Sequence, residues 1–156
     1  MSKAYGLPGL RLGWSVGPAD VIAEMWARQD YLTICPTMMA NKLAAYALRP
    51  DVRPRIIART RDYVRAGYAN LERWVGEQGE LLHMTPPQAA AIAFVRYDKE
   101  IDSSDLVMRL IKEKSTFVLA GDIFGIDRFI RISFGLPVPY VSAGLERLGE
   151  LLREVD

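Results

Sequence analysis

Residues 2–14 read Ser2-Lys3-Ala4-Tyr5-Gly6-Leu7-Pro8-Gly9-Leu10-Arg11-Leu12-Gly13-Trp14. A glycine-rich turn separates the lysine, which precedes it, from the arginine, which follows it. A lysine amine can condense with an aldehyde when its surroundings leave part of it unprotonated. Arginine presents a planar fork of donors to a phosphate group. Glycine lets the backbone bend sharply and approach a ligand closely. The segment therefore favours a site for a phosphorylated aldehyde, bound by Lys3 and Arg11.

These residues resemble the signature of the class I/II aminotransferases of fold type I, in which Ser-Lys is followed by a short spacer and then by Gly-x-Arg-x-Gly-aromatic. The resemblance implies that Lys3 is the lysine that forms the Schiff base with pyridoxal 5'-phosphate. It also implies that Lys3 carries the proton in the shift between amino-acid and oxo-acid adducts. Arg11 corresponds to the arginine that binds the phosphate of the cofactor.

A second match lies near the other end of the chain, at Phe129-Ile130-Arg131-Ile132-Ser133-Phe134-Gly135. It resembles the late strand of the family that carries an arginine for the α-carboxylate of the substrate. Alternation along a strand puts the apolar residues 130, 132 and 134 on one face and Arg131 on the other. We therefore expect Arg131 to bind and orient the amino acid or 2-oxo acid substrate that the resemblance implies.

Hydrophobic spacing predicts the secondary structure of the chain. We expect strands at 12–16, 81–84, 91–97, 116–119 and 129–134. We expect helices at 19–30, at 37–48, from about 49 to 78, from Ser103 onward and over a closing segment from about 141 to 155. Thr37 and Ser103 are suited to N-cap positions, and Pro54 suits the first turn of the long helix. The three tryptophans, Trp14, Trp26 and Trp74, are assigned to the core.

These elements predict an α/β fold, with an α+β small domain. By resemblance, the chain is the C-terminal half of a fold-type I transferase that starts at the cofactor lysine, with a small mixed sheet packed with helices and a long bridging helix. Residues 1–48 would be a remnant of the large cofactor-binding domain, residues 49–78 the bridging helix, and residues 79–156 the small C-terminal α/β domain.

In a complete family member, a large region upstream of the lysine stacks an aromatic side chain on the cofactor ring and pairs an aspartate with the pyridine nitrogen. We therefore expect the isolated chain to be inactive. The strand at 12–16 would lack its neighbours, so we expect residues 1 to about 30 to be poorly ordered or packed against another molecule. Residues 80–156 are expected to form a core.

The composition argues against several other classes of protein. The 20 basic and 19 acidic residues leave a formal charge of +1, so no overall field draws the chain to nucleic acid or to a membrane surface. A single cysteine, Cys35, and a single histidine, His83, exclude an internal disulfide and do not suggest a metal site. No apolar run approaches the length needed to span a bilayer, and a cytoplasmic location fits best.

The parent enzyme is thus expected to move an amino group between an amino acid and a 2-oxo acid, and by resemblance to be a homodimer. The same framework also serves lyases, decarboxylases and cyclising synthases that use pyridoxal phosphate. The other alternative is a non-catalytic binding or interaction domain, in which Lys3 is a solvated terminal residue.

Overall fold

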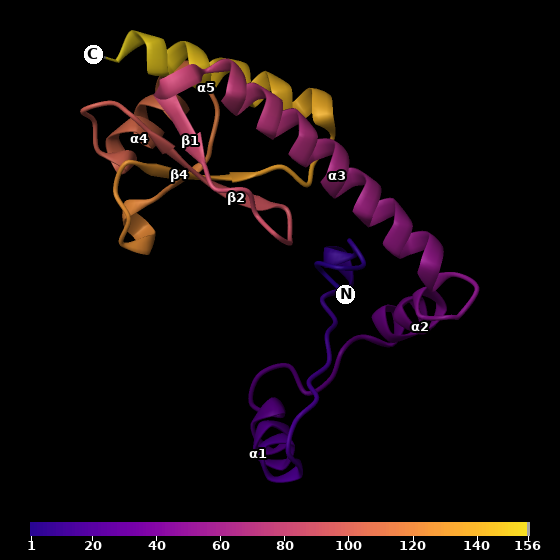
Figure 1. Ribbon diagram of the computed structural model, residues 1–156. Coiled ribbons are helices and arrows are strands. Elements are labelled where there is room, and N and C mark those ends of the chain that lie inside the picture. Colours follow the sequence, from indigo (N-terminus) through magenta and orange to yellow (C-terminus); the bar gives the residue numbers. More distant parts are fainter. Residues whose placement is uncertain (156) are drawn as a thin grey trace. The chain divides into compact units, whose positions relative to one another are not determined.

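The computed structural model describes residues 1–155, which form two compact units divided between Arg61 and Asp62 (Figure 1). The division falls within the helix α3 (Arg53–Glu77), which contributes its first turns to one unit and the rest to the other. The long helix predicted from the sequence is therefore confirmed as a single helix, with Pro54 in its first turn. The three-part domain division at residues 48 and 78 stays a prediction.

The first unit contains the short 3-10 helix η1 (Pro8–Leu10) and the helices α1 (Ala19–Gln29) and α2 (Met38–Ala47). Both α-helices match the predicted segments, and the Thr37 hydroxyl caps α2 by accepting the backbone N–H of Ala40 at 3.2 Å. The strand predicted at 12–16 is wrong, because these residues have no regular secondary structure. A strand needs a neighbour for its backbone hydrogen bonds, and the described part of this unit contains none.

The first unit buries few side chains, namely Tyr5, Ala40, Ala44, Ala47 and Val52. None of the residues of α1 is buried. The assignment of Trp14 and Trp26 to the core is therefore wrong, since their side chains are 58% and 77% exposed. An apolar pattern shows which face of a helix can be buried, but burial also needs an element to cover that face.

The second unit is built on a four-stranded sheet in the order β1 (Leu82–Met84), β2 (Ile92–Tyr97), β4 (Phe129–Ser133), β3 (Leu119–Ala120). All three strand pairs are antiparallel, so the expected mixed sheet is wrong in this respect. The helix α4 (Ser103–Lys114) connects β2 to β3, and these two strands run in the same direction. However, β4 inserts between them and pairs antiparallel with both.

One face of this sheet carries the core, which it forms with α4, with the C-terminal part of α3 and with α5 (Val138–Glu154) (Figure 1). Ile130, Ile132 and Phe134 are 0%, 3% and 1% exposed, which confirms the predicted alternation along β4. Trp74 of α3 belongs to the same core, as predicted. The opposite face of the sheet carries the cross-strand neighbours Phe94 and Arg131.

The start of α4 is stabilised by a residue from outside the helix. Ser103 was expected to cap α4, but this prediction is wrong, because Ser103 is the first helical residue and is fully buried. Its hydroxyl accepts the backbone N–H of Asp122 at 3.0 Å, and its own N–H donates to Asp127 Oδ1 at 2.8 Å. Asp127, which lies just before β4, therefore acts as the N-cap of α4. The sequence around the start of α4 does not indicate this role, because Asp127 is distant along the chain.

We expect Asp127→Ala to lower the free energy of unfolding by about 1 kcal/mol, because a first-turn N–H of α4 loses its acceptor. The pKa of Asp127 is lowered from its ordinary value of 3.8, chiefly by the backbone hydrogen bonds from Ser103 and Arg128. A lowered pKa in the folded state means that the ionised carboxylate adds stability above pH 3.8 and loses it as the pH falls through the folded-state pKa. Urea unfolding at pH 7 and at progressively lower pH should therefore show a shrinking difference between the variant and the wild type.

The matched control is Asp105→Ala, because Asp105 lies in the first turn of the same helix without a hydrogen-bonded partner among the described residues. It should cost only a few tenths of a kcal/mol through the helix dipole. Equal costs for Asp127→Ala and Asp105→Ala at pH 7 would contradict the capping role of Asp127.

Candidate functional site

Lys3 lies in a tight turn that glycine makes possible. The N–H of Gly6 donates to the Lys3 carbonyl oxygen at 2.9 Å, and the N–H of Leu7 donates to that of Met1 at 3.2 Å. Gly6 has φ +59°, and a Cβ at this position would lie 3.0 Å from Thr60 Oγ1 on α3. Both the left-handed backbone and the close approach to the helix favour glycine here. The lysine is therefore carried by a turn that packs on α3.

Arg11 follows η1 and has an unusual backbone conformation. Its φ is +48°, in the left-handed region that few residues other than glycine adopt. Its N–H donates to the Pro8 carbonyl oxygen at 3.2 Å, and its Nη1 lies 3.4 Å from the same oxygen. No carboxylate among the described residues pairs with the exposed guanidinium, whose remaining donors are therefore available to a ligand.

Lys3 and Arg11 line one open cavity of about 500 Å³. The other lining residues are Met1, Ser2, Ala4, Tyr5, Leu12, Gly13 and Trp14. An edge-to-face contact between the rings of Tyr5 and Trp14, with centroids 6.2 Å apart, connects the two segments that form the walls. The cavity has the size of a small-molecule site. The structure thus brings the two predicted cofactor residues to one cavity, while their roles stay predictions.

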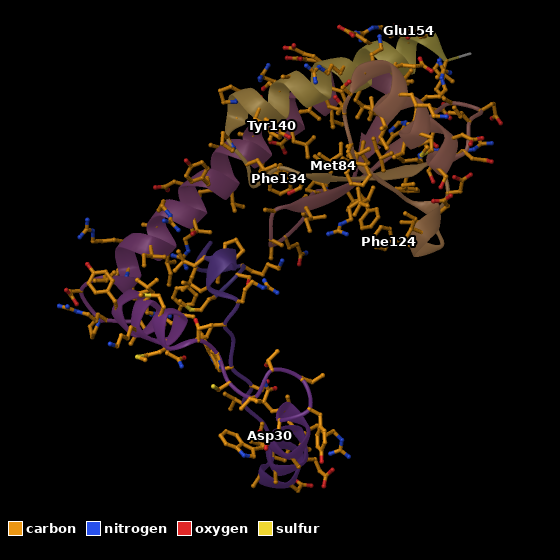
Figure 2. The ribbon with its side chains drawn as sticks, turned by 180° about the vertical axis from the view of Figure 1, so that it is seen from behind. Asp30, Met84, Phe124, Phe134, Tyr140 and Glu154 are labelled. Carbon is orange, nitrogen blue, oxygen red and sulfur yellow. The ribbon has the colours of Figure 1, made fainter. Side chains whose placement is uncertain are left out.

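Arg131 lies in the second unit, on the face of β4 that points away from the core. In the sheet it is flanked by Phe94 of β2 and by Leu119 of β3. Its guanidinium carbon lies 5.4 Å from the ring centroid of Phe124, the residue labelled in Figure 2. The Phe124 ring contacts Phe94 edge-on, with centroids 5.3 Å apart. Such a cation–π contact is worth about 0.5–1 kcal/mol at an exposed site. The two aromatic rings therefore support the guanidinium.

No carboxylate among residues 1–155 pairs with Arg131, which also lines an open cavity of about 560 Å³ together with residues of α5. A guanidinium without an internal partner can bind a carboxylate from a ligand. Phe94 and Phe124 are not among the site residues predicted from the sequence. The alternation in Ile92–Tyr97 could have placed Phe94 on the open face, whereas the position of Phe124 over Arg131 depends on how its loop folds.

The part of the chain that the structure describes was also compared with the requirements of a metal site and of a membrane-spanning helix. No group of three or more His, Cys, Asp or Glu side chains could hold a metal ion there. Likewise, none of the described helices combines the length and the apolar character that a membrane span requires. The side chain of Cys35 is free and exposed.

The model of the family described as aminotransferase class I and II matches residues 1–148. The chain belongs to this aminotransferase family. Capreomycidine synthase of Streptomyces vinaceus is 32% identical in an alignment of 155 positions, which covers 97% of this chain and 39% of that protein. An aspartate aminotransferase of Sulfolobus acidocaldarius is 27% identical in an alignment of 166 positions, which covers 99% of this chain and 40% of that protein. The chain thus spans about 40% of the length of these curated relatives.

Solved structures agree with this family assignment. A PLP-dependent aminotransferase from Streptococcus suis 89-1591 matches this chain with a TM-score of 0.91 and 28% sequence identity, over 99% of this chain and 41% of that one. The resemblance stated from the two motifs is therefore confirmed, and so is the fold-type I α/β class. The family implies pyridoxal phosphate as the cofactor, whereas binding of the cofactor by these 156 residues stays a prediction.

Proposed function

We propose that this chain is the cofactor-lysine portion of a PLP-dependent aminotransferase, in which Lys3 binds the cofactor aldehyde, Arg11 binds its phosphate and Arg131 binds the substrate carboxylate. The observation that carries the proposal is the cavity lined by both Lys3 and Arg11, inside a segment that matches the aminotransferase family model. Its walls include Lys3 and Arg11, neither of which has an internal ion-pair partner among the described residues, and this pair suits an aldehyde and a phosphate on one small ring.

Each residue has a defined chemical task in this proposal. The Nζ of Lys3 would hold the cofactor covalently through its aldehyde. Pyridoxal phosphate, when bound, supplies a conjugated ring that accepts the electron pair left on the substrate Cα after deprotonation. The same Lys3 Nζ would accept and carry the proton from the substrate Cα.

The two arginines provide binding and orientation. Arg11 would donate two parallel hydrogen bonds to the phosphate and so hold the cofactor through this group. Arg131 can bind the α-carboxylate in the same bidentate way, and its contact with Phe124 limits the positions of its guanidinium. The proposed substrates are an amino acid and a 2-oxo acid, and the proposed assembly is a cytoplasmic homodimer.

We expect no transamination from these 156 residues alone. The chain covers about 40% of the length of the relatives that it matches. In this proposal Lys3, Arg11 and Arg131 therefore provide only part of a complete site. Cofactor capture by Lys3 is nevertheless a reaction that the chain can be tested for by itself, because the amine and the phosphate-binding guanidinium line the same cavity.

The relative that is 32% identical is named a synthase, which favours a synthase on the same fold as the second candidate function. Both candidates use Lys3 in the same way, so cofactor binding does not separate them. The product does: an aminotransferase releases a 2-oxo acid from its amino-acid substrate and leaves the amino group on the cofactor, whereas a synthase releases a different product. The assay requires the complete protein.

The decisive test is to add pyridoxal phosphate to the chain, reduce with borohydride and map the modified amines by mass spectrometry. We expect Lys3 to be modified at lower concentrations than the exposed Lys112, and Lys3→Arg to abolish only that signal. Peptide mapping also separates Lys3 from the α-amine of Met1, which lines the same cavity. Equal modification of Lys3 and Lys112 would instead favour the non-catalytic binding domain.

A matched ligand tests Arg11 in the same experiment. We expect Arg11→Ala to weaken capture of pyridoxal phosphate at Lys3 by roughly tenfold, through loss of the charged hydrogen bonds to phosphate. Pyridoxal, which has the aldehyde but no phosphate, should be captured equally by the variant and the wild type. A similar loss for both ligands would show that Arg11 does not bind the phosphate.

A further inference from the structure

The first turns of α3 contact the turn that carries Lys3. Arg59 Nη2 donates to the Tyr5 carbonyl oxygen at 3.0 Å and lies 3.5 Å from that of Gly6. Arg53 Nε donates to the hydroxyl oxygen of Tyr5 at 3.0 Å. One arginine thus holds the backbone of the turn, and the other holds the tip of its buried aromatic ring.

These contacts continue to both proposed cofactor residues. On one side, the carbonyl oxygen of Lys3 accepts the N–H of Gly6. Gly6 directly follows Tyr5, whose carbonyl oxygen accepts from Arg59, so the hydrogen bond of Arg59 adjoins the one that closes the lysine turn. On the other side, the Tyr5 ring contacts Trp14, which lines the cavity together with Arg11. The position of the lysine relative to the arginine therefore depends on where the turn lies on α3.

We propose that Arg59 is a positioning residue for Lys3: its guanidinium holds the turn of residues 3–6 against α3 and thereby keeps the Lys3 amine at the cavity that Arg11 lines. The proposal rests on the proposed cofactor role of Lys3. Arg59 acts through the backbone of the turn. A planar guanidinium can bridge two neighbouring carbonyl oxygens, whereas the compact ammonium of lysine bonds to one of them as a point charge.

The first measurement is capture of pyridoxal phosphate at Lys3, with modification of Lys112 in the same sample as the internal reference. We expect Arg59→Ala to lower capture at Lys3 by roughly tenfold, because charged hydrogen bonds to the turn are lost. Arg59→Lys should recover part of it. The control is Arg61→Ala: Arg61 lies on the same helix but has no hydrogen bond or ion pair to another described residue, and its replacement should leave capture unchanged.

The second measurement needs no cofactor. Amide hydrogen exchange of Gly6 reports the turn, because its N–H bonds to the Lys3 carbonyl oxygen. We expect faster exchange at Gly6 in Arg59→Ala but not in Arg61→Ala. Exchange at Val95, in the middle of β2, should stay unchanged in both variants, which separates local loosening of the turn from global unfolding.

The outcomes distinguish this inference from the proposed function. If the wild type does not prefer Lys3 over Lys112, the cofactor role of Lys3 is wrong, and the inference that rests on it falls too. If the wild type prefers Lys3 and Arg59→Ala retains that preference, only the positioning role of Arg59 is overturned. Unchanged exchange at Gly6 in Arg59→Ala would also overturn it.

Discussion

Replacing Gly67 with alanine is expected to destabilise the second unit by at least about 3 kcal/mol, the upper range for overpacking a core. Gly67 is buried in α3, and a Cβ at this position would lie 1.9 Å from the carbonyl oxygen of Phe134 and 3.0 Å from its carbonyl carbon. These atoms belong to the backbone that follows β4, so they cannot rotate out of the way as a side chain could. The helix and the end of the arginine strand would have to move apart.

Gly76 provides a matched control in the same helix. A Cβ at this exposed position meets no atom within 4 Å, so Gly76→Ala should stabilise the helix by up to about 1 kcal/mol. Urea unfolding followed by circular dichroism would compare both variants with the wild type. If Gly67→Ala proved as stable as Gly76→Ala, the close packing of α3 on the segment after β4 would be wrong.

Replacing Gly121 with alanine should cost about 3 kcal/mol and should also disturb the surroundings of Arg131. A Cβ on Gly121 would lie 2.2 Å from the carbonyl oxygen of Ile126 and 2.5 Å from that of Phe129. The N–H of Gly121 donates to this same Phe129 oxygen at 2.7 Å, and its carbonyl oxygen accepts the N–H of Phe124 at 2.8 Å. Displacing this backbone therefore moves the ring that lies over the guanidinium.

The Nε–H resonance of Arg131 measures this second effect, because a nearby aromatic ring shifts it. We expect the resonance to move toward the position of a free arginine in Gly121→Ala. Gly125→Asn serves as the control in the same loop, since asparagine tolerates the φ of +77° and a Cβ there meets no atom within 4 Å. A wild-type shift for Arg131 in Gly121→Ala would contradict the link between the loop and the arginine.

The family and most of the secondary structure could be predicted because their signals are local. The lysine turn and the arginine strand appear as short motifs, and Ile130, Ile132 and Phe134 alternate within five consecutive positions. The helices α1, α2 and α3 follow from apolar spacing of the same short range. The failure of the strand at 12–16 has the opposite cause, since a strand forms only when distant residues supply its partner.

The same contrast between local signals and long-range contacts applies to the candidate site. The residues proposed for its chemistry, Lys3, Arg11 and Arg131, could be chosen from the sequence because each proposed task requires a particular side chain in a recognisable motif. Their supports could not, because Arg59 is far along the chain from Tyr5, and Phe124 reaches Arg131 only through the course of its loop. The antiparallel insertion of β4 between β2 and β3 likewise depends on pairing between distant segments.

By itself, the sequence determined the family and the periodic elements, because short-range motifs and spacing carry that information, and it supplied the residues that are proposed for the site. Only the tertiary structure decided which aromatic rings are buried, which arginine holds the lysine turn and which carboxylate caps α4. These outcomes depend on the free energy of contacts between residues that are distant in the sequence, and no local pattern specifies which of the possible contacts will form.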